Sequence, residues 1–531
     1  MGSLAAVSSR RGLIVVGVVL VAVAIGAVLL LRGSGDDHRA AVDDPLAEAL
    51  SFAPASAPAV AQFDVQAGSS QGRALRDLAR TFPAARFAAD GIRDSVHTLG
   101  LDADQDLPAL LGGPLVAWGP PDAIVSLTTS FTALRLELAP VLKAGVTAAV
   151  VGRDAGDVEA TLDRAQDDGR LRKLTDVAPG VAQYALPQGA GRIGVRDADL
   201  VLGADAAALR TAFALHDRGG GLTRATFTAR LGPLARRPAL IRATAEPRAL
   251  LSSRAGGVPW IDALRQGAAT VAIEKPGVRV RVHFATDPAR VAADQLPLAP
   301  GPQPPHPAPG ARPIDAGVRD LSQTIRVLDA AKAQLDVPVL KPVTDALDAL
   351  DSVRGPLKTF GGIDVDAALI DQLTGTTTIT PQAPGTIALR AELRDGDPLR
   401  TALNRLVAVP DFALNLAKVD LNVDRAGEAY TITKDGKAIM KAAVLENTLV
   451  VTDDLRAGLR AIANRRPTSP GAASGALSLH AEGAAVQDEI VRRFQLPGLA
   501  RLVLAGFGDL DGSARAERTG LDVDLKLTLN Q

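Results

Sequence analysis

The feature that most constrains the fold is a proline-dense segment that separates two similar halves of the chain. Nine prolines fall from Asp287 to Pro313, a density that excludes regular helix or sheet and favours an extended polyproline II spacer. On either side, the same patterns recur in the same order: an Arg-Asp pair before a helical stretch, three consecutive aliphatic residues, and a closing strand of alternating residues. These patterns begin at Arg153 and Arg394, at Leu200 and Leu449, and at Val278 and Leu521. Their order predicts an internal duplication.

Within each half, the hydrophobic period changes repeatedly between that of a strand and that of a helix. Strands are expected at 146–151, 181–186, 192–196 and 200–202, and helices at 73–80, 84–99, 157–165, 206–215, 318–335 and 343–353. Hairpins outnumber strand–helix–strand crossovers, which favours antiparallel pairing with helices on one face. The predicted fold class is α+β: two homologous modules of mainly antiparallel sheet packed with helices, preceded by one transmembrane helix.

The run from Gly12 to Leu31 contains twenty residues without a charged side chain. As a helix it would be about 30 Å long, which is the thickness of the bilayer hydrocarbon. The run is longer than the apolar part of a secretory signal and lacks a small-x-small cleavage site, so we expect an uncleaved anchor rather than a cleaved signal peptide. Arg10 and Arg11 precede it and favour a cytoplasmic N-terminus, and they also resemble a twin-arginine export signal weakly.

These observations predict a single-pass protein of the cell membrane with the bulk of the chain outside the cytoplasm. The expected division is a cytoplasmic tail (1–11), a transmembrane helix (12–31), a stalk (32–45), a first α+β module (46–287), a proline-rich linker (288–312) and a second α+β module (313–531).

Several local motifs suggest a family. They are the strand-like stretch 58–65 followed by Gly68-Ser69-Ser70-Gln71 at the start of a helix, Gly100-Leu101-Asp102, the stretch 106–112, and the passage 226–241. Together they resemble an uncharacterised family, a domain of unknown function, of membrane-anchored extracytoplasmic proteins from high-GC bacteria. The resemblance covers most of residues 46–287 and, more faintly, the second half. It implies one N-terminal membrane helix and a large extracytoplasmic part, and it implies no activity.

Composition excludes several classes of chemistry. The chain has no cysteine, so disulfides, thiolate metal sites, thiol catalysis and an acylated lipoprotein cysteine are ruled out. The 58 basic and 59 acidic residues give a net charge of −1, which argues against nucleic acid or anionic lipid as a partner of the whole surface. Aromatic residues make up only 3%, so recognition by ring stacking is not expected to dominate.

Two glycine motifs resemble sites of catalysis or cofactor binding. Ser70 lies in a G-x-S-x-G pattern between a strand and a helix, as a nucleophile elbow would, but too few strands can precede it. A helix cap therefore explains this serine better. The stretch from Gly189 to Gly194 has the letters of a dinucleotide motif, but it lies between two expected strands instead of before a helix. We expect a hairpin turn there.

Two groups of residues are candidates for metal ligands. Asp102, Asp104 and Asp106 have the spacing of the first calcium-loop ligands, but Leu107 and Gly113 stand where that loop needs glycine and glutamate. A solvated acidic loop or helix cap is the simpler interpretation. The histidines show no metal-ligand spacing; they are His38, His97, His216, His283, His306 and His480.

No catalytic, cofactor-binding or metal-binding residue is assigned from the sequence, and no cofactor is expected. The predicted function is a non-catalytic binding or interaction module of the cell envelope, held in the membrane through the segment 12–31, with an envelope protein or lipid as partner. A carrier or sensor of an apolar ligand such as lipid is the alternative, and a serine hydrolase using Ser70 is a remote one.

Overall fold

The computed structural model describes residues 42–64, 66, 68–81, 96–124, 138–247, 257–275, 277–301, 314–333, 341–383, 386–408, 422–434, 437–452, 476–484, 487 and 506–530. The expected membrane segment 12–31, the tail before it, most of the expected stalk, most of the expected helix 84–99 and residues 302–312 of the expected linker lie outside these ranges. None of the helices within them is both long and apolar enough to cross a bilayer.

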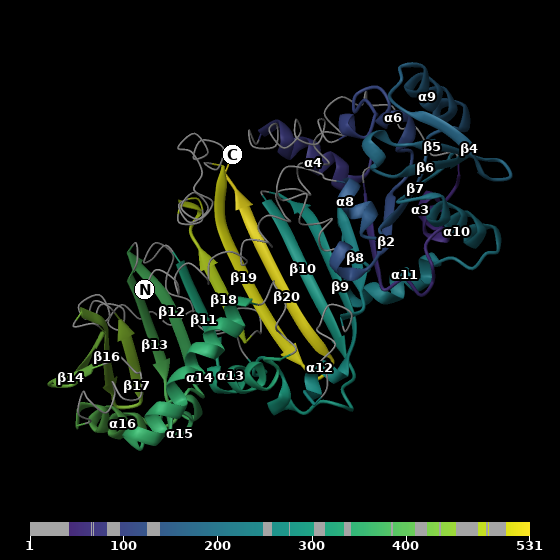
Figure 1. Cartoon of the computed structure of the whole chain (residues 1–531). Coiled ribbons are helices and arrows are strands. Elements are labelled where there is room, and N and C mark those ends of the chain that lie inside the picture. The colour runs from purple at the N-terminus through teal and green to yellow at the C-terminus, as the bar shows by residue number, and fades with distance from the viewer. Residues whose placement is uncertain are drawn as a thin grey trace.

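Twenty strands in the described part of the chain join into one sheet, and every neighbouring pair is antiparallel (Figure 1). The strands of the first half are β1 (Ala59–Phe63), β2 (Leu115–Gly119), β3 (Thr147–Val151), β4 (Arg172–Ala178), β5 (Val181–Ala185), β6 (Arg192–Arg196), β7 (Asp199–Gly203), β8 (Ile241–Ala245), β9 (Leu264–Glu274) and β10 (Gly277–Thr286). Those of the second half are β11 (Ile314–Arg319), β12 (Thr376–Ala383), β13 (Thr386–Glu392), β14 (Asn422–Ala426), β15 (Ala429–Lys434), β16 (Lys437–Leu445), β17 (Thr448–Thr452), β18 (Leu477–Ala481), β19 (Phe507–Glu517) and β20 (Gly520–Leu529).

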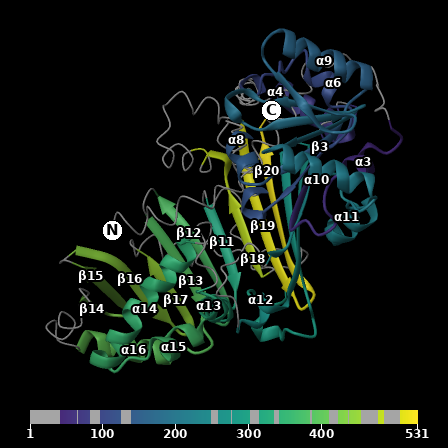
Figure 2. The same ribbon diagram turned by 45° about the vertical axis from the view of Figure 1, so that its right-hand side comes forward.

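The order of the strands repeats between the two halves. From one edge to the centre it is β4-β5-β6-β7-β3-β2-β1-β8-β9-β10. From the opposite edge to the centre it is β14-β15-β16-β17-β13-β12-β11-β18-β19-β20. Figures 1 and 2 show these edges at opposite ends of the molecule, with β10 and β20 side by side between them. The second half therefore has the topology of the first.

The two halves meet where β10 pairs with β20, over nine residue pairs; we call this pairing the seam. Its register is reciprocal: Gly277, the first residue of β10, lies opposite Thr528, the ninth of β20, and Gly520, the first of β20, lies opposite Ala285, the ninth of β10. Such reciprocity is the property of a contact with local twofold symmetry. The axis passes through the pair formed by Arg281 and Asp524.

Opposite charges face each other across the seam. Arg279 of β10 donates from Nε and Nη2 to the two carboxylate oxygens of Asp524, at 2.6 and 2.5 Å. His283 Nδ1 lies 2.7 Å from Asp522 Oδ1, and Arg281 Nε lies 3.5 Å from Asp524 Oδ2. Within the first half, Arg281 Nη2 also donates to Glu274 of β9 at 3.0 Å. Because side chains alternate along a strand, these groups share one face of the central sheet, and the aliphatic residues of β10 and β20 share the other.

The helices and 3-10 turns of the described residues connect these strands. They are α3 (Pro45–Ser51), α4 (Ser70–Thr81), α6 (Leu107–Leu110), α8 (Leu138–Lys143), α9 (Ala155–Asp167), α10 (Ala206–Asp217), α11 (Arg224–Leu231), α12 (Pro259–Ala263), α13 (Leu321–Ala330), α14 (Lys341–Gly361), α15 (Val365–Ala368), α16 (Asp397–Ala408), and the 3-10 turns η2 (Pro187–Gly189), η3 (Gly232–Leu234), η5 (Ala293–Gln295) and η6 (Ile370–Gln372).

The expectation that helices lie on one face of the sheet is wrong for the first half. Val201 of β7 packs in a core with α3, α10 and α11, whereas its neighbour Leu200 packs in a separate core with α6 and α9. Adjacent residues of a strand point to opposite faces, so the two groups of helices cover opposite sides. The physical reason is the unbroken apolar run from Leu200 to Leu202, which makes both faces of the strand apolar.

Most of the expected elements in the described residues are found close to their predicted places, among them β3, β5, β6, β7, α9 and α10. The helix expected at 318–335 is partly wrong, because Val318 belongs to β11. Asp320 separates strand from helix: its backbone is left-handed, with φ 48°, and its side chain accepts from Gln323 N at the start of α13. The helix expected at 343–353 is the middle of the longer α14.

The described part of the expected linker packs against the second half. Val291, Leu296 and Leu298 are at most 8% exposed and share an apolar cluster with Ala514 and Ala516 of β19. The only regular structure among residues 288–301 is the three-residue turn η5. This stretch therefore lies across the sheet and buries its aliphatic side chains there; the domain boundaries themselves stay a prediction.

Candidate functional site

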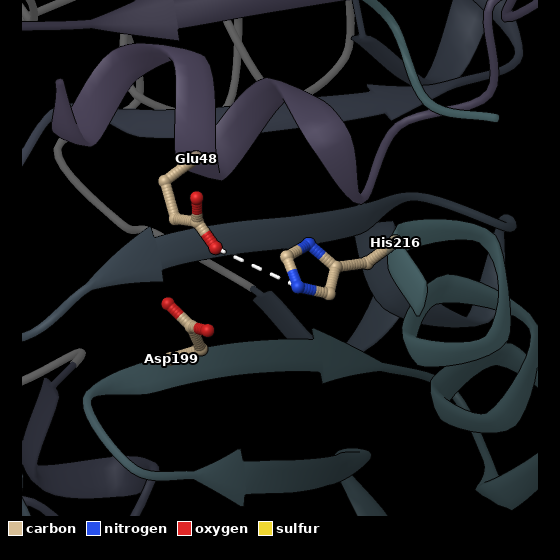
Figure 3. Close-up of side chains that lie close together, drawn as sticks. All are labelled: Glu48, Asp199 and His216. Carbon is tan, nitrogen blue, oxygen red and sulfur yellow. Dashed lines mark ion pairs between the residues drawn. The ribbon is translucent and has the colours of Figure 1, made fainter. Parts of the chain in front are cut away.

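Three side chains that could bind a cation converge beside the first half of the sheet: Glu48 of α3, Asp199 of β7 and His216 of α10 (Figure 3). One ligand atom from each lies within 4.8 Å of the others. His216 Nε2 is 3.6 Å from Glu48 Oε1, and these two side chains are 22% and 30% exposed. The group is therefore half-buried but within reach of solvent. We call it the Glu-Asp-His cluster.

Helix caps place two of the three residues. Asp44 accepts a hydrogen bond from Ala47 N at 3.1 Å, and proline follows it as the first residue of α3. Asp205 accepts from the backbone N–H groups of Ala207 and Ala208 at 2.9 Å each and so starts α10. These caps fix where each helix begins. Glu48 consequently lies in the first turn of the short α3, and His216 lies in the last turn of α10.

The third residue, Asp199, opens β7 and lies opposite Val151 of β3. Its backbone position is set by the β6–β7 hairpin, in which it pairs with Arg196. Val151 and Val201 lie on the face of the sheet that α3 and α10 cover, and both are fully buried in the core with those helices. Since Asp199 is two residues from Val201, its side chain points to the same face.

Aromatic packing holds the imidazole of His216 in place. The ring of Phe52 stacks on it, with centroids 4.5 Å apart and planes 8° from parallel. Phe52 also meets Phe213 edge-on at 5.3 Å, and both phenylalanines are almost fully buried. The imidazole therefore has one face against the core, while the side chain as a whole stays 22% exposed.

A hydrogen-bond chain favours one tautomer of His216. Ser51 Oγ donates to the carbonyl oxygen of Glu48 at 2.6 Å, so its lone pairs are left to accept. His216 Nδ1 lies 2.6 Å from Ser51 Oγ. Because the serine proton is already donated to Glu48, Nδ1 must carry the hydrogen and donate it to Ser51 Oγ. In the neutral ring, Nε2 then carries the lone pair, and Nε2 is the nitrogen that faces Glu48.

The simultaneous negative charges of Glu48 and Asp199 are unfavourable in the half-buried cluster. Burial and, next, the neighbouring Glu48 carboxylate raise the pKa of Asp199 to about 6. Arg196 lowers that pKa, but its Nη2 donates to Asp217 at 2.7 Å and its guanidinium lies over the ring of Phe213. Its position is thus set by contacts outside the cluster.

Ser70, the candidate nucleophile of the G-x-S-x-G pattern, is the first residue of α4. The side chain of its neighbour Ser69 accepts a hydrogen bond from Gly72 N at 2.9 Å, so the helix cap expected at this turn is formed by Ser69 rather than by Ser70. Gly72 is required by close packing: a Cβ there would lie 2.1 Å from Gln66 O. The glycine pattern is explained by this tight turn.

The acidic loop is held together by its own contacts. Asp106 is fully buried, accepts from Asp102 N at 2.7 Å and forms an ion pair with Arg170 at 2.6 Å. Asp102 Oδ1 accepts from the backbone N–H groups of Asp104 and Gln105. The carboxylates therefore close the loop through contacts within it. The expectation of a solvated loop or helix cap is wrong for Asp106, which is buried and, although it precedes α6, makes no side-chain hydrogen bond to that helix.

The glycine stretch 189–194 begins in the connection between the antiparallel strands β5 and β6 and continues into β6, so it belongs to a hairpin, as expected. Of the histidines, His283 and His480 each contact one aspartate, Asp522 and Asp511 respectively, and His97 is exposed on the surface. His38 and His306 lie outside the described residues. The structure thus singles out His216 as the histidine that meets two carboxylates.

Sequence reasoning missed the Glu-Asp-His cluster. Its members are far apart in the chain and come from two helices and a strand, so no local spacing marks them. The one available signal is that an aspartate and a histidine lie at opposite ends of a predicted strand–helix unit, and this is too common to be specific.

Comparisons with known proteins give no family. No family model and no curated protein matches the chain. Among solved structures, one titled "Structure of crystal form III of TP0453" aligns with 46% of this chain and 82% of its own length, at 6% identity and a TM-score of 0.25. A likeness at that TM-score carries no argument about fold or function, so the site has to be interpreted from its own geometry.

Proposed function

We propose that the chain is a membrane-anchored, extracytoplasmic binding protein of the cell envelope without catalytic activity, built from two homologous modules. The observation that carries this proposal is the reciprocal seam between β10 and β20, together with the repeated strand order. Joining two like units through nine paired residues gives one continuous sheet with a broad surface. Such a scaffold suits display and binding, because hydrogen bonding across the seam holds the two halves in a fixed orientation.

The structural roles of the residues that resemble catalytic or ligand-binding motifs support a function other than catalysis. Ser70 belongs to the tight turn that starts α4, Asp106 is held by Arg170, and the glycine stretch 189–194 forms part of a hairpin loop and the start of β6. Each residue type that suggested chemistry has a structural role that accounts for it. The family resemblance described above implies the same type of protein, an envelope module without known activity.

The proposed topology is testable because the chain has no native cysteine, so a single introduced cysteine is the only labelled site. Ala160 is exposed on α9. In intact cells, a membrane-impermeant maleimide is expected to label Ala160→Cys, and to label Ser3→Cys only after permeabilisation. Labelling of Ser3→Cys in intact cells, or release of the protein from membranes by alkaline carbonate, would contradict the anchored topology.

The binding role needs a separate measurement. Crosslinking in intact cells, followed by purification of the full chain, is expected to yield adducts with a defined envelope component. A version that carries only residues 1–45 is the control for contacts made by the membrane segment alone. Identical adducts from both versions would refute a binding role for the two modules.

A second candidate is a carrier of an apolar ligand. Val282, Phe284 and Leu525 lie on the aliphatic face of the central strands, and each keeps part of its surface accessible. Native mass spectrometry of the full chain in detergent is expected to show a co-purified lipid that is lost in Val282→Asp. Recovery of bare protein alone would exclude this candidate and leave the first unaffected.

A further inference from the structure

We propose that the Glu-Asp-His cluster binds one divalent transition-metal ion of the zinc class, with Glu48, Asp199 and His216 as its protein ligands. The site is independent of the binding role proposed above, because it rests on the contacts of these three side chains alone.

The geometry is close to that of a metal site. In a tetrahedral zinc site, bonds of about 2.0–2.1 Å place neighbouring ligand atoms about 3.4 Å apart. His216 Nε2 and Glu48 Oε1 are 3.6 Å apart, so these two ligand atoms need almost no movement to bind the same ion. The remaining ligand atoms lie within 4.8 Å, and rotation of the carboxyl groups of Glu48 and Asp199 can shorten these separations while the backbone stays fixed.

The histidine is oriented as a metal ligand should be. In metal sites, the ring nitrogen away from the ion usually donates to a carbonyl, carboxylate or other acceptor, which fixes both the tautomer and the ring plane. Here Ser51 Oγ is that acceptor, at 2.6 Å from Nδ1, and it is itself held by the carbonyl of Glu48. The stacked ring of Phe52 fixes the plane. This support of His216 is an observation independent of the acidic groups.

A dication would also resolve the charge of the cluster. Two half-buried carboxylates face the same space, and the nearby Arg196 is held by Asp217 and by the ring of Phe213. One divalent ion would compensate both negative charges at once. The donor set decides the class of ion, since one imidazole nitrogen with two carboxylate oxygens suits zinc or manganese. Calcium instead takes six to eight oxygen ligands.

Binding would join three separate elements of the fold. Glu48 lies on α3, the first helix of the described chain and the one that follows the predicted stalk; Asp199 lies on the sheet, and His216 on α10. An ion shared by the three would fasten α3 to the sheet. The full chain should therefore gain thermal stability when the ion is added.

The test uses the full chain in detergent, stripped with a chelator and titrated calorimetrically with zinc chloride, and in parallel with calcium chloride. We expect one zinc ion per chain, a higher unfolding temperature with zinc, and much weaker binding of calcium. Glu48→Gln, Asp199→Asn and His216→Gln should each weaken zinc binding at least tenfold. Ser51→Ala should weaken it by about tenfold, because the loss of an outer-shell partner typically costs 10–100-fold in affinity.

His480→Gln is the matched control, because His480 contacts a single aspartate, Asp511, in the second half; its zinc affinity should equal that of the unmodified chain. The proposal is overturned if the unmodified chain shows no zinc binding, if calcium binds as tightly as zinc, or if His216→Gln binds zinc as tightly as His480→Gln does. Should His216→Gln fail to fold by circular dichroism, Glu48→Gln takes its place in this comparison, since the Glu48 side chain is the more exposed.

Discussion

Replacing Gly277 with alanine should separate the seam at one end. A Cβ at Gly277 would lie 1.9 Å from the carbonyl oxygen of Leu527 across the seam, whereas carbon contacts are optimal at about 3.5–4.0 Å. The two strands would have to move apart by more than 1 Å, about enough to break a ladder hydrogen bond. Overpacking costs about 1–3 kcal/mol and the lost hydrogen bond about 1 kcal/mol, while the smaller backbone entropy of the unfolded chain returns a small part. The free energy of unfolding should therefore fall by about 2 kcal/mol.

Two related substitutions calibrate this loss. Gly520 is the equivalent first residue of β20, and a Cβ there would lie 2.5 Å from Phe284 O, so Gly520→Ala should destabilise in the same way but less. Gly267→Ala in β9 is the control. Its Cβ would meet no backbone atom closer than Ala245 O at 3.4 Å, so it should cost well under 1 kcal/mol.

The assay is urea unfolding of the full chain in detergent, followed by tryptophan fluorescence. The chain has two tryptophans, and Trp260 packs in the cluster that contains Leu521 and Val523 of β20. In a Trp118→Phe background, Trp260 therefore reports on the seam. The reasoning is refuted if Gly277→Ala unfolds at the same urea concentration as Gly267→Ala, or if Gly520→Ala is the more damaging of the two seam variants.

Three further outcomes are expected. Val282→Cys combined with Val523→Cys should form a disulfide within one chain, because these residues lie directly opposite each other at a separation that a disulfide spans. After cleavage at a protease site introduced within 302–312, the two halves should stay joined on a non-reducing gel and separate on a reducing one. Asp106→Ala should lower stability by about 3 kcal/mol in chemical denaturation, since it removes one partner of a buried ion pair. Hydrogen bonding to His283 lowers the pKa of Asp522, so the ionised carboxylate stabilises the fold above pH about 4. This stabilisation is lost as the pH falls through the lowered pKa, and Asp522→Asn should therefore make acid unfolding less steep.

The fold was largely accessible from the sequence because its periodicities are local. The alternating strands at 278–282 and 521–525 and the apolar run 200–202 each predict a strand from a few neighbouring residues. Errors arose where a single residue decides the backbone, as at Asp320, whose left-handed conformation separates β11 from α13. The apolar residues on both faces of β7 also indicate two covered faces, and this signal is present in the sequence alone.

The Glu-Asp-His cluster could not be predicted because it depends on how three elements pack. Glu48 reaches it only because α3 lies on the same face of the sheet as α10, and that placement follows from the core around Phe52 and Phe213. Nothing in the spacing of Glu48, Asp199 and His216 reports on that core. The charges of the seam were more accessible, since one closing strand is basic and the other is acidic in the printed sequence.

This charge difference has a consequence for the choice of partner. A closing strand that paired with a copy of itself in the same reciprocal register would place Arg281 against Arg281, or Asp524 against Asp524, at the centre of the contact. Like charges directly opposite are destabilising in antiparallel sheets. The two halves are therefore suited to each other and mismatched to themselves. If produced as separate chains, they should associate as a mixed pair, and neither should dimerise through this edge.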